Sequence, residues 1–170
     1  FFLIPLMMAI FGFLFFFLFK MLTYEKQDPY HLLNNINSGS LTKRWQSAYE
    51  LSNLMTDINK VPTSQMFIDK MITMYEKSIH DDSRIRTYLA LAMGQTGNKL
   101  FCDKLINGLN DAYVENRIAS IKSLGMIGCN ESINEINMLI VFDGNDQEKL
   151  AAVIAAGLIL NNSSIKYLFC

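Results

Sequence analysis

A short pattern that occurs three times constrains the fold of this chain more than any other feature of the sequence. The copies occupy residues 85–97, 116–128 and 148–160. When they are aligned, each copy has a cation in its second position and a glycine in its tenth: Arg86, Arg117 and Lys149, then Gly94, Gly125 and Gly157. The copies are 31 and 32 residues apart, a period that is typical of repeat proteins.

Each copy has the apolar spacing of an amphipathic helix, and such a helix cannot bury its apolar face alone. Stacking successive copies would bury it. Small residues at Ala92, Ser123 and Ala155 predict positions where a neighbouring helix approaches closely. The glycines suit either a tight crossing or a helix C-terminus.

The segments between the copies predict the partner helices of an all-α repeat. Apolar residues recur at helical spacing near residues 29–38, 41–55, 64–80, 100–109 and 133–140, and the sequence has no strand pattern. The first helix begins at Asp28-Pro29, where the carboxylate caps the helix. We expect Gly39 to end it in the left-handed conformation.

The two ends of the repeat region depart from the pattern. Arg44 aligns with Arg86, but Ser52 takes the place of Gly94, so residues 29–55 are a diverged first unit. Residues 161–164, Asn-Asn-Ser-Ser, are expected to start a further helix that runs to Cys170.

The pattern of a cation, small residues and then leucine and glycine resembles the second helix of HEAT repeats, in particular the short HEAT-like repeats also found in phycobilin lyases. The resemblance covers about residues 29–170 and is strongest over 81–160. It implies a right-handed α-solenoid of about four units, the last incomplete, with a ladder of ion pairs between units. The candidate acids of that ladder are Asp82, Asp111 and either Asp143 or Asp146.

Residues 1–19 are uncharged, and as a helix they would be roughly 28 Å long at about 1.5 Å per residue, which is one bilayer crossing. We therefore expect a transmembrane helix over 1–22, a short connection over 23–28 and the repeat domain over 29–170. The anchor residues are Phe1, Phe11, Phe19 and Lys20, whose ammonium would reach the headgroups. A cleaved signal peptide would need a basic start, a shorter apolar core and a small-residue cleavage site, and the sequence has none of these.

The charges after the anchor, Lys20, Lys26, Lys43 and Arg44, favour a cytoplasmic repeat domain. The net charge of -1 gives no reason to expect nucleic acid as a partner. Since the chain begins at phenylalanine, we expect the natural N-terminus to be processed or preceded by further residues.

Residues that could act in catalysis or bind a metal are few and scattered. Cys102, Cys129 and Cys170 are odd in number and lack metal-ligand spacing, so buried free thiols are expected rather than a disulfide. His31 and His80 are each isolated, which argues against a metal site. Because no nucleophile elbow, phosphate-binding loop or zinc signature is present, we expect no enzymatic activity, catalytic residue, metal or cofactor.

One surface departs from a purely structural pattern. If Leu89, Ala92 and Met93 face the core, residues 87, 91 and 95 and their equivalents face outward. These positions form a largely apolar ridge where a solvated face would be polar: Leu91, Ile118, Lys122, Met126, Leu150, Ile154 and Leu158. Either a partner protein binds this ridge, or further C-terminal chain or a further repeat covers it.

The sequence thus predicts a membrane-anchored HEAT-repeat scaffold or accessory subunit. Its partners would be the lipid bilayer, through residues 1–22, and one or more subunits of a membrane protein complex. The alternative is a lyase-like HEAT module that acts on a tetrapyrrole or a modified protein.

Overall fold

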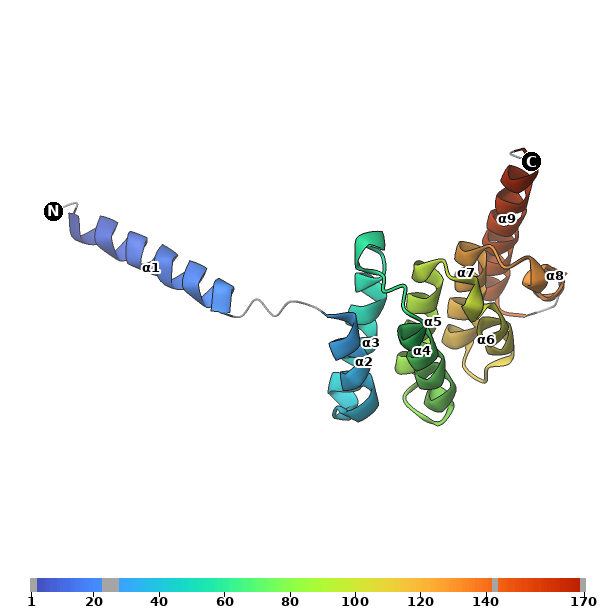
Figure 1. The fold of residues 1–170 in the computed structure, drawn as a ribbon, viewed down its shortest axis with the longest axis horizontal. Helices are drawn as coiled ribbons and strands as arrows, with labels where there is room; N and C mark the ends of the chain where they lie inside the picture. The colour runs from blue at the N-terminus through green and yellow to red at the C-terminus, as the bar shows by residue number, and fades with distance from the viewer. Residues whose placement is uncertain (1–2, 23–27, 142–143, 169–170) are drawn as a thin grey trace.

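The computed structural model describes residues 3–22, 28–141 and 144–168, and all regular structure in these residues is helical. Nine α-helices follow one another along this described part of the chain (Figure 1). They are α1 Leu3–Leu22, α2 Pro29–Ser38, α3 Leu41–Leu54, α4 Gln65–Lys77, α5 Ser83–Thr96, α6 Cys102–Asn107, α7 Val114–Ile127, α8 Ile133–Val141 and α9 Asp146–Leu168.

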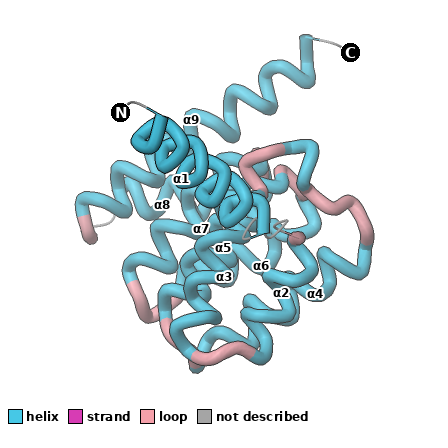
Figure 2. The backbone as a smooth tube through the Cα atoms, turned by 90° about the vertical axis from the view of Figure 1, so that its left-hand side faces the viewer, coloured by secondary structure: helices cyan, strands magenta, loops and turns pink. Residues whose placement is uncertain are grey.

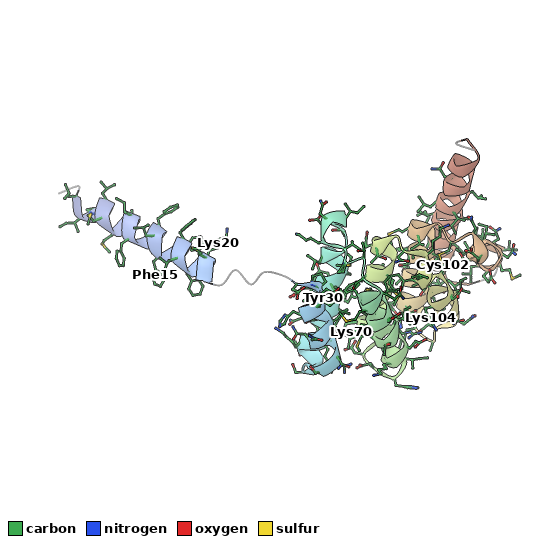
Figure 3. All side chains as sticks on the ribbon, in the orientation of Figure 1. Phe15, Lys20, Tyr30, Lys70, Cys102 and Lys104 are labelled. Atoms are coloured by element: carbon green, nitrogen blue, oxygen red, sulfur yellow. A yellow bond between two sulfur atoms is a disulfide. The ribbon has the colours of Figure 1, made fainter. Side chains whose placement is uncertain are left out.

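Helix α1 stands apart from the other helices (Figure 1). Residues Leu3–Met21 have a mean hydropathy of 2.3 and none of this span is buried, so α1 is long and apolar enough to cross a membrane. A signal sequence would have the same properties. Phe11 and Phe19 are exposed and Lys20 lies in the last turn, whereas Phe1 and most of the 23–28 connection lie outside the described residues. Figure 3 shows Phe15 and Lys20 projecting from α1, away from the side chains of α2–α9.

Helices α2–α9 form two rows. The even-numbered helices each pack on the odd-numbered helix that follows, and α3, α5, α7 and α9 pack on one another in order. Viewed along the rows, α3, α5 and α7 overlap on one side and α2, α4 and α6 on the other (Figure 2). We call each pair a unit, so that α2/α3 is the first and α8/α9 the fourth. Between the rows lies one apolar core, in which Phe67, Tyr75 and Phe101 are the largest fully buried side chains.

Local sequence signals fix most helix ends. Side-chain oxygens of Asp28, Ser40, Ser64 and Asp82 accept backbone N–H groups at the starts of α2, α3, α4 and α5. Gly97 and Gly128 end α5 and α7 with φ of 66° and 70°, a conformation that favours glycine. Gly39 does not follow this rule. Its φ of -74° is extended, so the expected left-handed cap on α2 was wrong.

The repeat glycines Gly94 and Gly125 are crossing positions. A Cβ on Gly94 would lie 2.7 Å from Ser123 Cα, and one on Gly125 would lie 2.7 Å from Ala155 Cα. Since real Cβ contacts are not that short, only glycine allows these helices to approach so closely. Ala92, Ser123 and Ala155 are each buried, as expected of close-contact positions.

Two expected helices differ in the structure. Residues 99–110 are a 3₁₀ turn (η3, Lys99–Phe101), then α6, then a second 3₁₀ turn (η4, Gly108–Asn110), rather than one α-helix. Residues 161–164 do not begin a new helix, because α9 continues through them to Leu168. The residue in the place of Gly97 and Gly128 is Leu160, and without glycine there the helix has no left-handed stop.

Candidate interaction surface

An ion pair crosses each boundary between units. Arg44 of α3 pairs with Asp81, Arg86 of α5 with Asp111, and Arg117 of α7 with Glu148. In each pair the cation belongs to one unit and the acid to the next. The repeated cations therefore hold successive units in register, and with them the surface that the odd-numbered helices present.

The pair between the second and third units is the most buried of the three. The side chains of Arg86 and Asp111 are 8% and 4% exposed, and Arg86 Nε donates to Asp111 Oδ2 at 2.5 Å. Arg86 Nη1 also donates to the Tyr75 carbonyl at 2.6 Å, and the guanidinium lies 4.1 Å from the centre of the Tyr75 ring. The guanidinium thus meets a carboxylate, a carbonyl and a ring face, each of which suits a cation.

Asp111 is held in its charged form. Burial pushes its pKa up, but hydrogen bonds from the Tyr113 N–H, the Asn116 amide and Arg86 outweigh burial and hold the pKa below the ordinary value. Burial also raises the pKa of the neighbouring Tyr75 hydroxyl.

The pair between the third and fourth units is bidentate. Arg117 Nε and Nη2 donate to the two carboxylate oxygens of Glu148 at 2.5 and 3.0 Å, and this contact raises the pKa of Arg117. Glu148 was not among the predicted acids, nor was Asp81. Asp82 instead caps α5 and pairs with Arg84. Asp146 lies in the first turn of α9, and Asp143 lies outside the described residues.

The predicted ridge becomes more exposed from α5 to α9. Leu91 and Ile118 are half-buried and pack against the core, Met126 is half-buried, and Lys122 is exposed. On α9, Leu150, Ile154 and Leu158 are 63%, 54% and 41% exposed. The exposed apolar part of the ridge is therefore concentrated on α9.

Sequence reasoning missed a second exposed set on α9. Val153 is 51% exposed, and Gly157 is exposed and so open that a Cβ added to it would meet no atom of the described residues within 4 Å. The repeat period relates Val153 to Ala90 and Ile121, so the sequence did carry a signal for this apolar position. Ala90 and Ile121 are fully buried in the structure, whereas Val153 is not.

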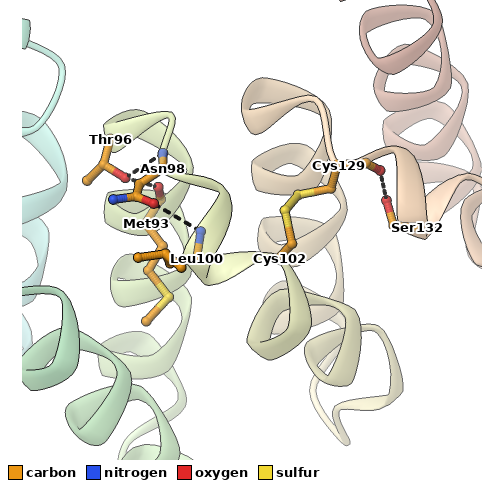
Figure 4. The surroundings of a disulfide bond; sticks show 7 residues. All are labelled: Met93, Thr96, Asn98, Leu100, Cys102, Cys129 and Ser132. Carbon is orange, nitrogen blue, oxygen red and sulfur yellow. Dashed lines mark hydrogen bonds between the residues drawn. A yellow bond between two sulfur atoms is a disulfide. The ribbon is translucent and has the colours of Figure 1, made fainter. Parts of the chain in front are cut away.

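A disulfide joins Cys102 to Cys129 across the third unit (Figure 4). It links the first residue of α6 to the residue that follows the Gly128 cap of α7, with the two Cα atoms 5.9 Å apart. Both cysteines are buried, and Ser132 Oγ donates to the Cys129 carbonyl at 2.8 Å. The expectation of free thiols at these two positions was wrong, and Cys170 lies outside the described residues.

Within the described part of the chain, no group of three or more His, Cys, Asp or Glu side chains is arranged to hold a metal ion. No protein-family model matches this chain, and no curated protein matches it.

Proposed function

We propose that this protein is a membrane-anchored helical-repeat scaffold that holds a partner protein close to the bilayer. Helices α2–α9 would form a short right-handed α-solenoid of the HEAT-like type, and α1 would be its transmembrane anchor. The observation that carries the proposal is the apolar part of the ridge on α9, Leu150, Ile154 and Leu158, which is exposed in the chain by itself.

The repeat pattern supports this architecture. Three ion pairs join one unit to the next, and two glycine crossings, Gly94 and Gly125, recur one period apart. Each unit contacts mainly its neighbours, as in repeat proteins that use an extended face for binding.

An amphipathic or membrane-proximal helix of a membrane protein fits the ridge best. Helix recognition in grooves uses aliphatic anchors at helical spacing, and Leu150, Ile154 and Leu158 have that spacing. Each fully buried aliphatic side chain contributes roughly 1.5 to 3 kcal/mol, so two or three are enough to decide binding.

The ridge is tested with a variant whose changes lie only on exposed ridge positions, Lys122→Glu combined with Leu158→Asp. We expect it to lose the partner that co-purifies from detergent-solubilised membranes while keeping wild-type helicity. Met138→Asp, on an exposed position of α8, is the matched control and should keep the partner. Retention of every partner by the ridge variant would refute the proposed binding surface.

The disulfide bears on the side of the membrane where α2–α9 lie. Disulfides persist in oxidising compartments and are rare in the cytosol. The lysines after α1 favour the opposite side, but that rule compares the flanks of a membrane helix and the sequence contains only one flank. We therefore propose that the repeat domain lies on the oxidising, non-cytoplasmic side.

Protease added to the non-cytoplasmic face of the membrane that carries the protein tests this orientation. The repeat domain should be digested from that side, and Cys129, which is buried in the fold, should react with a maleimide in the denatured protein only after reduction. Protection from protease until the membrane is lysed would place the domain in the cytoplasm and overturn the assignment.

The anchor itself is tested by Phe11→Arg. A charge at the centre of a spanning helix costs roughly 2.5 to 3.5 kcal/mol on insertion scales, so the variant should integrate poorly. Release of the wild-type protein into the supernatant by carbonate extraction would instead exclude a spanning α1.

A further inference from the structure

Helix α9 carries the face with which α5 and α7 each bind the next helix of the row. On each of these helices the face centres on an apolar residue and on the glycine one helical turn after it. The pairs are Ala90 and Gly94 on α5, Ile121 and Gly125 on α7, and Val153 and Gly157 on α9. The first two pairs are buried, whereas Val153 is 51% exposed and Gly157 is exposed.

Helix α7 covers the face of α5, and α9 covers the face of α7. Each covering helix places a small residue against the glycine. Ser123 lies against Gly94, and its Oγ donates to the Ala90 carbonyl at 2.8 Å. Ala155 lies against Gly125 in the same way. At Gly157 no atom lies within 4 Å of the corresponding point. Helix α9 therefore has the same face that α5 and α7 use to pack against the next helix. Among the described residues, no helix packs against Gly157 on this face.

We propose that this face binds the same face of a second copy of the chain, α9 against α9, with the two Gly157 residues at the crossing. The α9 outer face consists of the exposed residues Leu150, Val153, Ile154, Gly157 and Leu160. Leu150 and Ile154 belong to both this face and the ridge, so a paired α9 would leave Leu158, Met126 and Lys122 of the ridge to a partner. The pairing does not depend on the scaffold function proposed above.

The described chain after Gly157 does not turn back to cover this face. After α5 and α7, the left-handed glycines Gly97 and Gly128 turn the chain into the next unit. At the equivalent position, Leu160 continues the helix, and α9 extends to Leu168. The backbone thus moves on along the axis of α9 instead of folding back over its outer face.

The composition of the remaining helices argues for α9 as the occupant. A helix seated at Gly157 must bring a small residue to the crossing, and within α2–α8 every alanine, every glycine and every serine away from a helix end is already buried. The outer side of α3 bears Lys43 and Glu50, whose charges would lose water against an aliphatic face.

A symmetric α9 pair brings a small residue to the crossing and places no charge against the aliphatic face. A two-fold interface sets each residue near its own equivalent, so glycine faces glycine and the two backbones approach closely. The five positions of the outer face include no charged side chain, so the face meets itself without like-charge repulsion.

The mass of the full-length protein in detergent, measured by light scattering over a concentration series, tests the pairing. Wild type should be a dimer. Val153→Glu puts two like charges into the interface and should raise the dissociation constant by roughly 100-fold or more. Ile58→Glu, at an 84% exposed position far from α9, is the control and should remain dimeric.

Gly157→Leu is the second variant, because it adds bulk at the crossing while placing a good helix former on an open helix face. It should be a folded monomer by circular dichroism and light scattering, which separates loss of pairing from unfolding. A monomeric wild type would overturn the proposal. A dimer that survives both Val153→Glu and Gly157→Leu would also overturn it and would assign the association to another surface, such as α1.

Discussion

The two ends of the row of odd-numbered helices differ in what they show to solvent. On the outer side of α3, Lys43 and Glu50 occupy the positions that Ile85 and Ala92 occupy in α5, where both are fully buried. On the outer side of α9, Val153 and Gly157 repeat the residue types of the interior. The first end has polar residues in place of a packing face, and the last end keeps the packing face.

Terminal repeats with a polar outer face keep a repeat protein soluble and stop further stacking. The α3 end has this property and the α9 end does not. The α9 end instead keeps a face of the kind that is buried between helices inside the row. We expect such a face where one more helix packs onto that end.

The largest expected effect concerns the interior of the row. Asp111→Asn removes one partner of the Arg86–Asp111 pair, which is nearly inaccessible to solvent, and should lower the free energy of unfolding by about 3 to 5 kcal/mol. Asp81→Asn, in the pair near the α3 end whose side chains are 27% and 17% exposed, should cost less. Chemical denaturation of both variants measures the difference, and equal losses would remove the distinction between interior and end.

The same pair has a defined pH dependence. The folded pKa of Asp111 lies below its ordinary value of 3.8, so its contribution to stability is complete above that value and is lost as the pH falls through the folded pKa. The stability difference between wild type and Asp111→Asn should therefore be constant near neutral pH and shrink below about pH 4. A difference that stays constant down to about pH 2 would contradict this account.

A smaller effect is expected from equivalent leucine substitutions at an interior boundary and at the α3 end. Ala155→Leu overpacks the contact with Gly125 and should cost about 1 to 3 kcal/mol. Glu50→Leu, at the aligned but exposed position of α3, should change stability by less than about 0.5 kcal/mol. Hydrogen exchange should show lost protection confined to α7–α9 in the first variant, because repeat units contact only their neighbours.

The smallest expected effect is the change in stability when a repeat glycine is replaced by alanine, and its sign should differ between Gly125 and Gly157. Gly125→Ala places a methyl group against the Ala155 backbone and should destabilise the protein by about 1 kcal/mol or more. Gly157→Ala meets open space and should stabilise the protein by up to about 1 kcal/mol, the difference in helix propensity. Thermal unfolding at protein concentrations too low for pairing measures both, and destabilisation by Gly157→Ala would show that α9 is already covered.

The repeated pattern was sufficient to predict most of the helices, since periodicity and capping residues act locally. The second copy, residues 116–128, was predicted as a helix, and it lies within α7 and its Gly128 cap. Asp28 was predicted to cap the first helix, and it caps α2. The small residues at 92, 123 and 155 were predicted as contact positions from the period alone, and all three are buried.

Features that depend on approach between distant segments were predicted less well. Of the three ion-pair acids, Asp111 was predicted correctly. The other two were displaced by one or a few residues, to Asp81 and Glu148, because helix spacing does not decide which carboxylate near a helix start reaches the neighbouring unit. The Cys102–Cys129 pairing has no local signal at all. The polar run after Leu160 resembled a helix start, but asparagine and serine do not stop a helix that has no glycine or proline to end it.

The disulfide has a consequence for the order in which the molecule opens. Its two cysteines are 27 residues apart and enclose the whole of α6 and α7, so the bond closes a loop within one unit. For a loop of this length, chain entropy alone favours the folded unit by about 3 to 4 kcal/mol. Local unfolding in a repeat array proceeds from whichever units are least stable. Amide exchange should accordingly begin at α2/α3 and α8/α9 and reach α6/α7 last, and reduction of the disulfide should remove this order without separating the units.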